Sequence, residues 1–261
     1  MNGSSLGMTD HLASARELKA RLAYPPAPGS FSDVEVAGLP DPVRRYLGAS
    51  IALGAPLAAA ARFRMSGSIK LGRRWVRFRA QQIEAPHQGF VWAARAGGFI
   101  VGSDRYADGQ GAMNWKLLGL IPVMHANGPD VSRSAAGRVG AEAVWVPTAL
   151  LPRFGVTWNA TDPHHITANY RLDDAEIELH YTLEDDARVR SVVFDRWGDP
   201  DGSGTWEHHP FGFEVSRYST FDGVTIPSAG RAGWFYGTDR WSEGEFFRSE
   251  ITDFHLVTEA R

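Results

Sequence analysis

The chain has 261 residues, of which 43% are hydrophobic and 22% charged, and this is the composition of a soluble globular protein with a sizeable core. Its formal net charge of −3 provides no overall field that would recruit nucleic acid or an acidic membrane. It has no cysteine, which excludes disulfides, thiolate catalysis and cysteine-ligated metals. The lack of cysteine fits a reducing compartment, and we expect a cytoplasmic protein.

The beginning of the chain shows no secretion signal. Residues 11–23 carry charges among their apolar residues and are too polar for the core of a signal peptide. Met8 offers an alternative start to Met1. No run of 18 apolar residues occurs, so the sequence predicts no membrane span.

Two short helices are expected before the main domain. Ser14–Ala23 has an amphipathic pattern that prolines end, and Asp41–Leu47 carries a proline at its start, where helices tolerate one. We therefore expect an N-terminal helix and linker over residues 1–38. A single antiparallel β domain is expected over residues 39–261.

Most of the remaining sequence alternates apolar and polar residues with a period of two, which is typical of strands with one buried and one exposed face. Short links join these segments, and Asp222-Gly223 is the strongest hairpin signal. Short links favour antiparallel neighbours. We expect nine to eleven strands, drawn from residues 62–69, 74–81, 89–96, 99–105, 165–172, 176–184, 188–197, 213–221, 224–227, 231–237 and 245–257.

Residues 134–151 break this pattern and predict the main helix. An apolar stripe at helical spacing explains why the helix would pack on the sheet; it comprises Val139, Ala143, Val146 and Leu150. Pro147 is expected to kink or tighten the last turn, because it cannot donate a hydrogen bond to the carbonyl of Ala143.

A second stripe on the same helix carries Arg138, Glu142 and Trp145. Arg138 and Glu142 are four residues apart and can form an ion pair. The pair is either a solvated surface feature or part of a cleft between helix and sheet. In a cleft, a carboxylate is costly unless it is paired.

Several stretches resemble an uncharacterised bacterial family that is known only as a domain of unknown function. The matching stretches are residues 39–47, 89–92, 104–113, 116–119 and 141–152, followed by Trp158. This chain has Arg138-Val139-Gly140 where that family tends to carry a bulkier Arg-Tyr-Leu. The resemblance supplies no catalytic residues to transfer.

The resemblance implies a sheet wrapped on a helix, similar to the lipoprotein-carrier half-barrels that shelter acyl chains. The expected fold class is therefore mainly β (α+β). It has a large curved antiparallel sheet, a half-open barrel, around one central helix, with short N-terminal helices. Such an analogy of fold does not establish function.

Candidate site residues lie on the predicted helix and on a strand end near residues 104–106. The apolar connection Leu117–Met124 is either a lid or a simple crossover. Glu142 is the candidate proton carrier, with Arg105, Lys116 and His125 as candidate basic partners. The candidate ligand-binding residues form an apolar, aromatic set with a few polar groups; they are Trp92, Tyr106, Trp115, Arg138, Trp145, Thr148 and Trp158.

Metal and cofactor sites are not predicted. The histidines at 164–165 and 208–209 are adjacent in sequence, so on a strand they point to opposite faces and are interpreted as surface residues. No phosphate-binding loop or dinucleotide fingerprint occurs.

A row of arginines on one hairpin is interpreted as a solvated face and not as a nucleic-acid site. The row comprises Arg62, Arg64, Arg77 and Arg79, and the glutamates at 176, 178 and 184 are expected to balance it.

Three functions remain open at this stage. The first is binding of an apolar or amphipathic small molecule in a cavity between sheet and helix. The second is cofactor-independent acid/base catalysis at Glu142, such as isomerisation, hydration or cyclisation. The third is an interaction module without a cavity. The sequence leaves the oligomeric state open.

Overall fold

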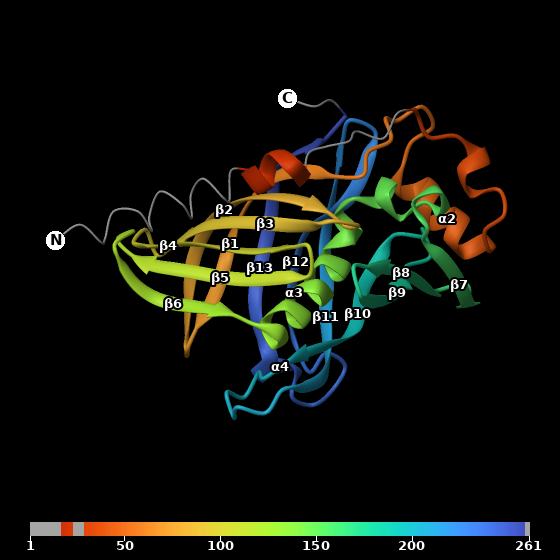
Figure 1. Cartoon of the computed structure of the whole chain (residues 1–261). Helices are drawn as coiled ribbons and strands as arrows, with labels where there is room; N and C mark the ends of the chain where they lie inside the picture. The colour runs from red at the N-terminus through yellow and green to blue at the C-terminus, as the bar shows by residue number, and fades with distance from the viewer. Residues whose placement is uncertain (1–16, 23–28, 259–261) are drawn as a thin grey trace.

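The computed structural model describes residues 17–22 and 29–258, and this part of the chain forms one antiparallel sheet of thirteen strands (Figure 1). The strand order is β6-β5-β4-β3-β2-β1-β13-β12-β11-β10-β9-β8-β7. The strands are β1 (Ala61–Leu71), β2 (Arg74–Ala85), β3 (Gly89–Ala96), β4 (Ile100–Ala107), β5 (Gln110–Leu117), β6 (Ile121–Asn127), β7 (Thr157–Asp162), β8 (His165–Leu172), β9 (Ala175–Leu183), β10 (Val189–Gly198), β11 (Glu207–Phe221), β12 (Val224–Trp234) and β13 (Glu245–Leu256).

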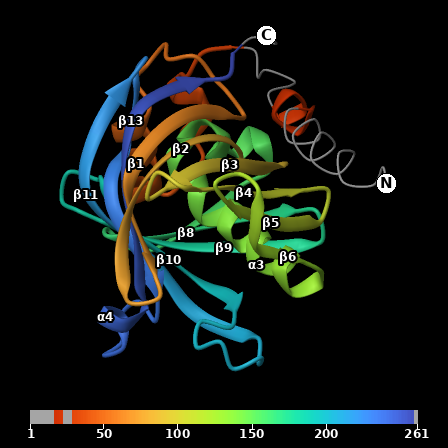
Figure 2. The ribbon, with the colours of Figure 1, turned by 90° about the vertical axis from the view of Figure 1, so that its left-hand side faces the viewer.

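The sheet curves strongly, and Figures 1 and 2 show it curled around the helix α3 (Pro129–Glu142). Register shifts at Arg64/Met65, Val189/Ser191 and Val215/Arg217 bend the strands, as β-bulges do. Strands β6 and β7 are its two edges, so the barrel is open. The expected fold class is confirmed: mainly β, with a half-open sheet around one central helix.

Short helices precede the sheet in the described part of the chain. They are the 3-10 turn η1 (Asp33–Val36) and α2 (Asp41–Ser50), and residues 17–22 are also helical. The rest of the expected helix Ser14–Ala23, and both candidate start methionines, lie outside the described residues. A further short helix, α4 (Trp241–Gly244), precedes β13. None of the described helices is long and apolar enough to cross a membrane.

The bounds predicted for the central helix were wrong at both ends. It begins at Pro129, because a proline in the first turn needs no hydrogen-bond partner and Gly128 adopts the positive φ of 108° that leads into it. The α-helix ends at Glu142. Because Pro147 cannot donate to Ala143, the chain continues as the tighter turns η2 (Ala143–Trp145), η3 (Pro147–Leu150) and η4 (Pro152–Phe154).

The predicted apolar stripe is the part of this segment that packs in the core. Its four residues, Val139, Ala143, Val146 and Leu150, are completely buried. The segment covers the inner face of the sheet, by which we mean the concave face that α3 contacts.

Three strands, β5, β6 and β7, lie outside the segments that the sequence predicted. The connection Leu117–Met124, expected to be a lid or a crossover, is the turn of the hairpin β5–β6. Apolar and polar residues do not alternate clearly in β6, because this edge strand is largely exposed on both faces. The short edge strand β7 was also missed. The predicted segments 224–227 and 231–237 belong to one strand, β12. The eleven predicted segments thus correspond to ten strands of a sheet that has thirteen.

The arginine row and the glutamates expected to balance it from another exposed face lie on different parts of the sheet. Arg62, Arg64, Arg77 and Arg79 lie on β1 and β2, whereas Glu176 and Glu178 lie on β9 and Glu184 directly follows it. Four strands, β13, β12, β11 and β10, separate β1 from β9 in the sheet. Both groups have partners of opposite charge nearby, such as Asp253 for Arg64 and Arg171 for Glu176.

One glycine of α3 is required by close packing. A Cβ at Gly140 would lie 2.6 Å from Cγ2 of Ile177 on β9. We expect Gly140→Ala to lower the free energy of unfolding by about 1–3 kcal/mol despite alanine's higher helix propensity, because of overpacking. A Cβ at Gly48 in α2 would meet no atom within 4 Å. We therefore expect Gly48→Ala to raise the free energy of unfolding by about 0.5–1 kcal/mol, because alanine has the higher helix propensity. Urea denaturation of the two variants checks this; equal effects would contradict it.

Candidate functional site

A buried ion-pair cluster lies where the C-terminal half of α3 meets the first half of the sheet. Arg138 Nε donates to Glu142 Oε1 at 2.8 Å, and Arg138 Nη1 donates to Asp104 Oδ2 on β4 at 2.9 Å. The side chains of Arg138 and Glu142 are only 17% and 13% exposed. The pair is therefore buried between helix and sheet and is not a solvated surface feature.

Aromatic rings enclose the guanidinium group of Arg138. Its Cζ atom lies 4.4 Å from the ring centroid of Phe90 and 5.2 Å from that of Trp92. Trp115 packs against Trp92 and donates from Nε1 to Asp104 Oδ1 at 2.8 Å. The expected site residues Arg138, Trp92 and Trp115 are thus brought together around one carboxylate, and the rings strengthen the ion pairs by excluding water.

Two members of the cluster, Gln82 and Glu84, were not predicted from the sequence. Gln82 and Glu84 lie on the inner face of β2, where Gln82 Nε2 donates to Glu142 Oε2 at 2.5 Å and to Glu84 Oε2 at 2.9 Å. The predicted strand ended at Gln81. Continuing its alternation past Phe78 and Ala80 would have placed residues 82 and 84 inside.

Burial sets the protonation of the cluster. It raises the pKa of Glu84 well above its ordinary value of 4.5, and the charge of Glu142 raises this pKa further. Burial also raises the pKa of Asp104, although Arg138 and the Trp115 hydrogen bond oppose the shift. Burial alone would lower the pKa of Arg138, but Glu142 and Asp104 more than offset this and raise it.

A second arginine balances the charges. Burial, followed by the like charge of Arg138, lowers the pKa of Arg196 on β10 to about 9, so Arg196 stays charged at neutral pH. Its guanidinium lies over the rings of Phe211 and Trp234. Burial favours the uncharged form of Glu84, so the charges of Arg138 and Arg196 oppose mainly those of Asp104 and Glu142, both of which act on Arg196.

The other predicted ligand-binding residues lie in the core or at its border. Trp145 packs edge-on against Phe63 and Phe213. Thr148 Oγ1 donates to the carbonyl of Ala58 at 2.7 Å, and Trp158 Nε1 donates to that of Leu150 at 2.9 Å. Both contacts stabilise the turns that follow α3.

The three basic partners proposed for Glu142 lie elsewhere. Asp104 and Trp115 face inward, so their neighbours Arg105 and Lys116 project from the outer, convex face of the sheet. His125 is exposed on β6 and bonds with Asn114 and Asn127. In the described part of the chain Arg138 and Gln82 donate to Glu142, and the side chain of Glu84 also interacts with it. Its predicted contact with Arg105, Lys116 or His125 is not formed.

A groove of about 1300 Å³ runs beside the N-terminal half of α3. Small residues of the helix, Ala136 and Gly137, lie on one side, and Ile177 and Phe194 of β9 and β10 on the other. Tyr106, a predicted ligand-binding residue, also lines it. No group of three or more histidine or acidic residues within residues 17–22 and 29–258 is arranged to hold a metal ion.

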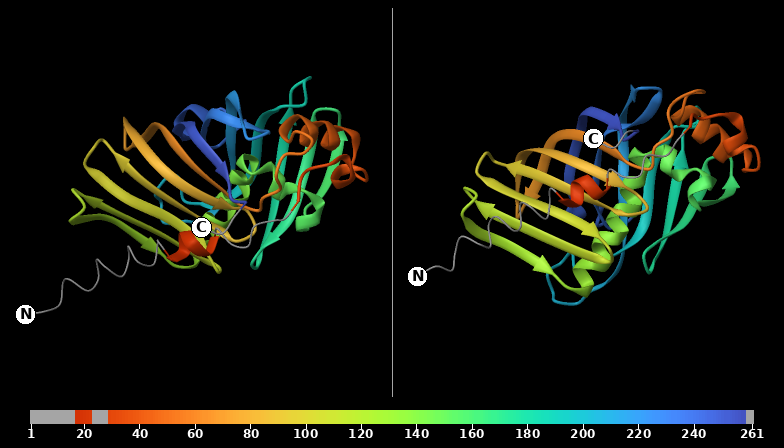
Figure 3. Two further views of the ribbon diagram at one scale, coloured as in Figure 1. Left: turned by 90° about the horizontal axis from the view of Figure 1, so that it is seen from above. Right: turned by 45° about the horizontal axis from the view of Figure 1, so that its top comes forward.

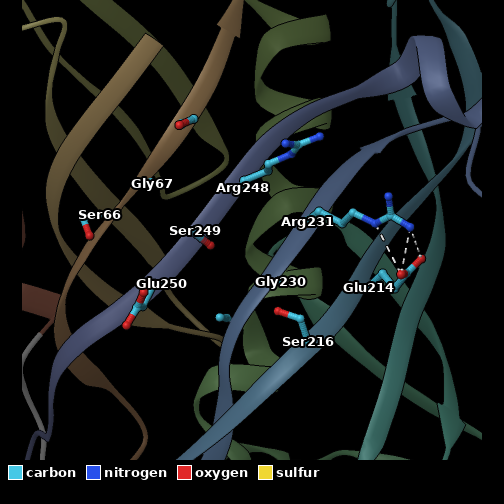
Figure 4. A pocket seen from close by; sticks show the side chains of 11 residues that line it. Ser66, Gly67, Glu214, Ser216, Gly230, Arg231, Arg248, Ser249 and Glu250 are labelled. Atoms are coloured by element: carbon cyan, nitrogen blue, oxygen red, sulfur yellow. Dashed lines mark hydrogen bonds and ion pairs between the residues drawn. The ribbon is translucent and has the colours of Figure 1, made fainter. Parts of the chain in front are cut away.

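A smaller hollow, of about 370 Å³, lies on the outer face of strands β1, β11, β12 and β13 (Figure 4). Short side chains such as Ser66 and Ser216 leave room between charged ones. Arg231 contacts both carboxylate oxygens of Glu214, at 2.9 and 3.2 Å. The charges that border this hollow thus largely satisfy one another.

Removing the central cation should be costly. We expect Arg138→Met to lower the free energy of unfolding by about 3–5 kcal/mol, because Asp104 and Glu142 would stay buried without their partner. Arg171→Met, which breaks the exposed 2.6 Å pair with Glu176, is the matched control and should cost about 0–1 kcal/mol. Denaturant unfolding measures both; equal losses would show that the buried cluster contributes no more than a surface pair.

The raised pKa of Glu84 predicts a dependence of stability on pH. Because its folded pKa exceeds the value near 4.5 of the unfolded chain, its contribution is complete below pH 4.5 and is lost as the pH rises through the folded pKa. Glu84→Gln, which keeps the shape without the charge, should therefore show a shallower loss of stability as the pH rises above 4.5. Unfolding measured across pH tests this, and parallel curves for the two proteins would refute it.

Comparison with known proteins gives matches of family and of fold. No curated protein matches the sequence. Similar solved structures include a LolA superfamily protein from Nitrosomonas europaea (TM-score 0.43, 8% identity, covering 82% of this chain and 91% of that chain). Another is a putative outer membrane lipoprotein-sorting protein domain from Vibrio parahaemolyticus (0.41, 10%, 76% and 85%). A third is a DUF1329 family protein from Desulfovibrio piger ATCC 29098 (0.41, 11%, 83% and 90%).

The expected resemblance to a family of unknown function is confirmed. The model of one family matches residues 29–246, which is most of the chain. The protein therefore belongs to the family of unknown function DUF6544.

Proposed function

We propose that this protein binds an amphipathic small molecule in the groove beside α3. The observation that carries the proposal is the groove itself, which has a volume of about 1300 Å³ and runs between the helix and the sheet. This volume exceeds the few hundred to about 1000 Å³ of an ordinary ligand pocket, so a long or flexible molecule has room in it.

Apolar residues of the helix and of the sheet line part of the groove. Ala136 lies on α3, and Ile177 and Phe194 lie on β9 and β10, where Phe194 packs directly against Gly137. This part of the groove suits the apolar body of a ligand.

Two polar groups border the apolar surface. In one, Asp173 Oδ2 accepts hydrogen bonds from Tyr106 Oη at 2.8 Å and from the backbone N–H of Gly109 at 2.9 Å. In the other, the Cζ atom of Arg133 lies 4.0 Å from the ring centroid of Trp197, and its Nη2 atom lies 2.9 Å from Nε2 of His208. A ligand with a polar head could use either group while its apolar part contacts the groove walls.

Catalysis at Glu142 is the second candidate. It is favoured by Glu84, a carboxylic acid held protonated by burial and joined to Glu142 through Gln82. The residues that line the groove do not include Glu142, and Arg138 occupies one of its oxygens. Ligand binding is therefore the function that the geometry supports better. The third possibility, an interaction module without a cavity, leaves the groove unexplained.

The first experiment asks whether the purified protein carries a ligand. Native mass spectrometry of protein from its own host is expected to show a co-purifying small molecule, and a fluorescent dansyl fatty acid should bind to the delipidated protein. The proposal would be contradicted by a protein that carries no co-purifying small molecule and also fails to bind the probe.

A matched pair of variants locates the site. Ala175 is a half-buried alanine of β9 that lines the groove, and Ala93 is a half-buried alanine on the outer face of β3. We expect Ala175→Phe to weaken probe binding at least about tenfold by filling the groove, and Ala93→Phe to leave it unchanged. Equal binding by the two variants would show that the probe binds elsewhere.

A further inference from the structure

Three hairpin turns lie along one edge of the molecule. Strands β1 to β6 run up and down in sequence order, so the turns β1–β2, β3–β4 and β5–β6 must lie at the same end of these strands. Figure 3 shows the three turns in a row, at the left of the view from above. We call residues 68–77, 95–101 and 116–124 at these turns the hairpin rim.

Large apolar side chains are exposed on this rim. Of the ten large hydrophobic residues that are exposed in the described part of the chain, eight belong to the rim; they are Leu71, Trp75, Phe99, Leu118, Leu120, Ile121, Val123 and Met124. The remaining two, Val34 and Leu53, lie in the segment before β1. Scattered exposed apolar residues are normal, but a group of this size on adjacent turns indicates a binding surface.

The rim is also uniformly basic. Its three segments contain six cationic residues and no aspartate or glutamate; they are Lys70, Arg73, Arg74, Arg77, Arg95 and Lys116. The backbone carbonyls of Glu243 and Gly98 accept from Lys70 and Arg95, so these contacts leave both charges without a carboxylate partner. The net charge of −3 for the whole chain conceals this local concentration.

Apolar tips flanked by cations match the boundary of an anionic bilayer. Such a boundary offers hydrocarbon to leucine and phenylalanine, an interface to tryptophan, and lipid phosphates to lysine and arginine. A partner strand paired with the edge strand β6 would cover only the last of the three turns, and Pro122 removes one donor from that edge. The rim as a whole fits a flat surface better than an added strand.

We propose that the hairpin rim docks this protein on the surface of membranes rich in anionic phospholipid. The exposed residues at the three turns enter the headgroup and upper acyl region, while the flanking lysine and arginine side chains contact phosphates. The protein lies on the membrane and does not span it. This inference does not depend on a ligand in the groove beside α3.

Vesicle sedimentation tests the proposal with the full chain. Wild-type protein should pellet with vesicles of phosphatidylglycerol and phosphatidylcholine, pellet much less with phosphatidylcholine alone, and lose binding as salt rises. The double variant Leu118→Ser/Leu120→Ser should bind at least about tenfold more weakly, because two apolar side chains no longer enter the bilayer. Binding equal to wild type by this variant would overturn the proposal, as would no binding by the wild type.

The chain supplies a closely matched control. Val34 and Leu53 are 84% and 67% exposed, against 68% and 71% for Leu118 and Leu120, but lie away from the rim. Val34→Ser/Leu53→Ser should therefore bind anionic vesicles as the wild type does. An equal loss of binding in this control would show that exposed apolar residues contribute to vesicle binding wherever they lie. The rim would then not be the docking site.

A single added reporter keeps the test independent of any loss of stability. Leu120→Trp should be quenched by brominated phospholipid in anionic vesicles, and Leu53→Trp should show no quenching beyond that of the wild type. Equal quenching of the two variants would contradict the proposal. If sedimentation velocity shows a dimer that Leu118→Ser/Leu120→Ser abolishes, while vesicles bind no protein, the rim contacts a second copy of the chain and the proposal fails.

Discussion

A long antiparallel sheet with one apolar face must cover that face, and in this protein residues 129–154 do so. The sheet curls around this segment, and its inner strands contribute phenylalanine, tryptophan and methionine to a continuous core with Val139, Ala143, Val146 and Leu150. Hydrophobic burial of this kind has no direction of its own. The position of α3 therefore depends on hydrogen bonds and ion pairs, whose geometry is specific. The ion pairs of Arg138 with Asp104 and Glu142 are the most buried of these.

The cluster around Arg138 joins three parts of the chain that are far apart in sequence. Asp104 comes from β4, Glu84 from β2 and Glu142 from the helix, and the side chains of all three are largely removed from water. Such groups are tolerated together only when their charges balance, which the raised pKa of Glu84 and the presence of Arg196 achieve. Glu142, the candidate proton carrier of the sequence analysis, thus helps to hold the helix in place beside the groove.

Packing against the sheet also limits which residues α3 can carry. Gly140 allows the helix to approach Ile177, and Gly137 lies 3.0 Å, measured from its ideal Cβ position, from the ring of Phe194. These small residues bring the helix close to β9 and β10 at one point beside the groove.

The sequence by itself determined the class of fold and the composition of each face. Period-two alternation identified most strands, and helical spacing identified both the apolar stripe of α3 and the pairing of Arg138 with Glu142, because these are properties of neighbours along one element. It could not determine which elements are adjacent in space. The order of the thirteen strands placed Asp104, Gln82 and Glu84 around Arg138, directed Arg105 and Lys116 to the outer face, and separated the basic turns from the glutamates of β9. These outcomes depend on strand register and on contacts between distant segments, which only the tertiary structure decides.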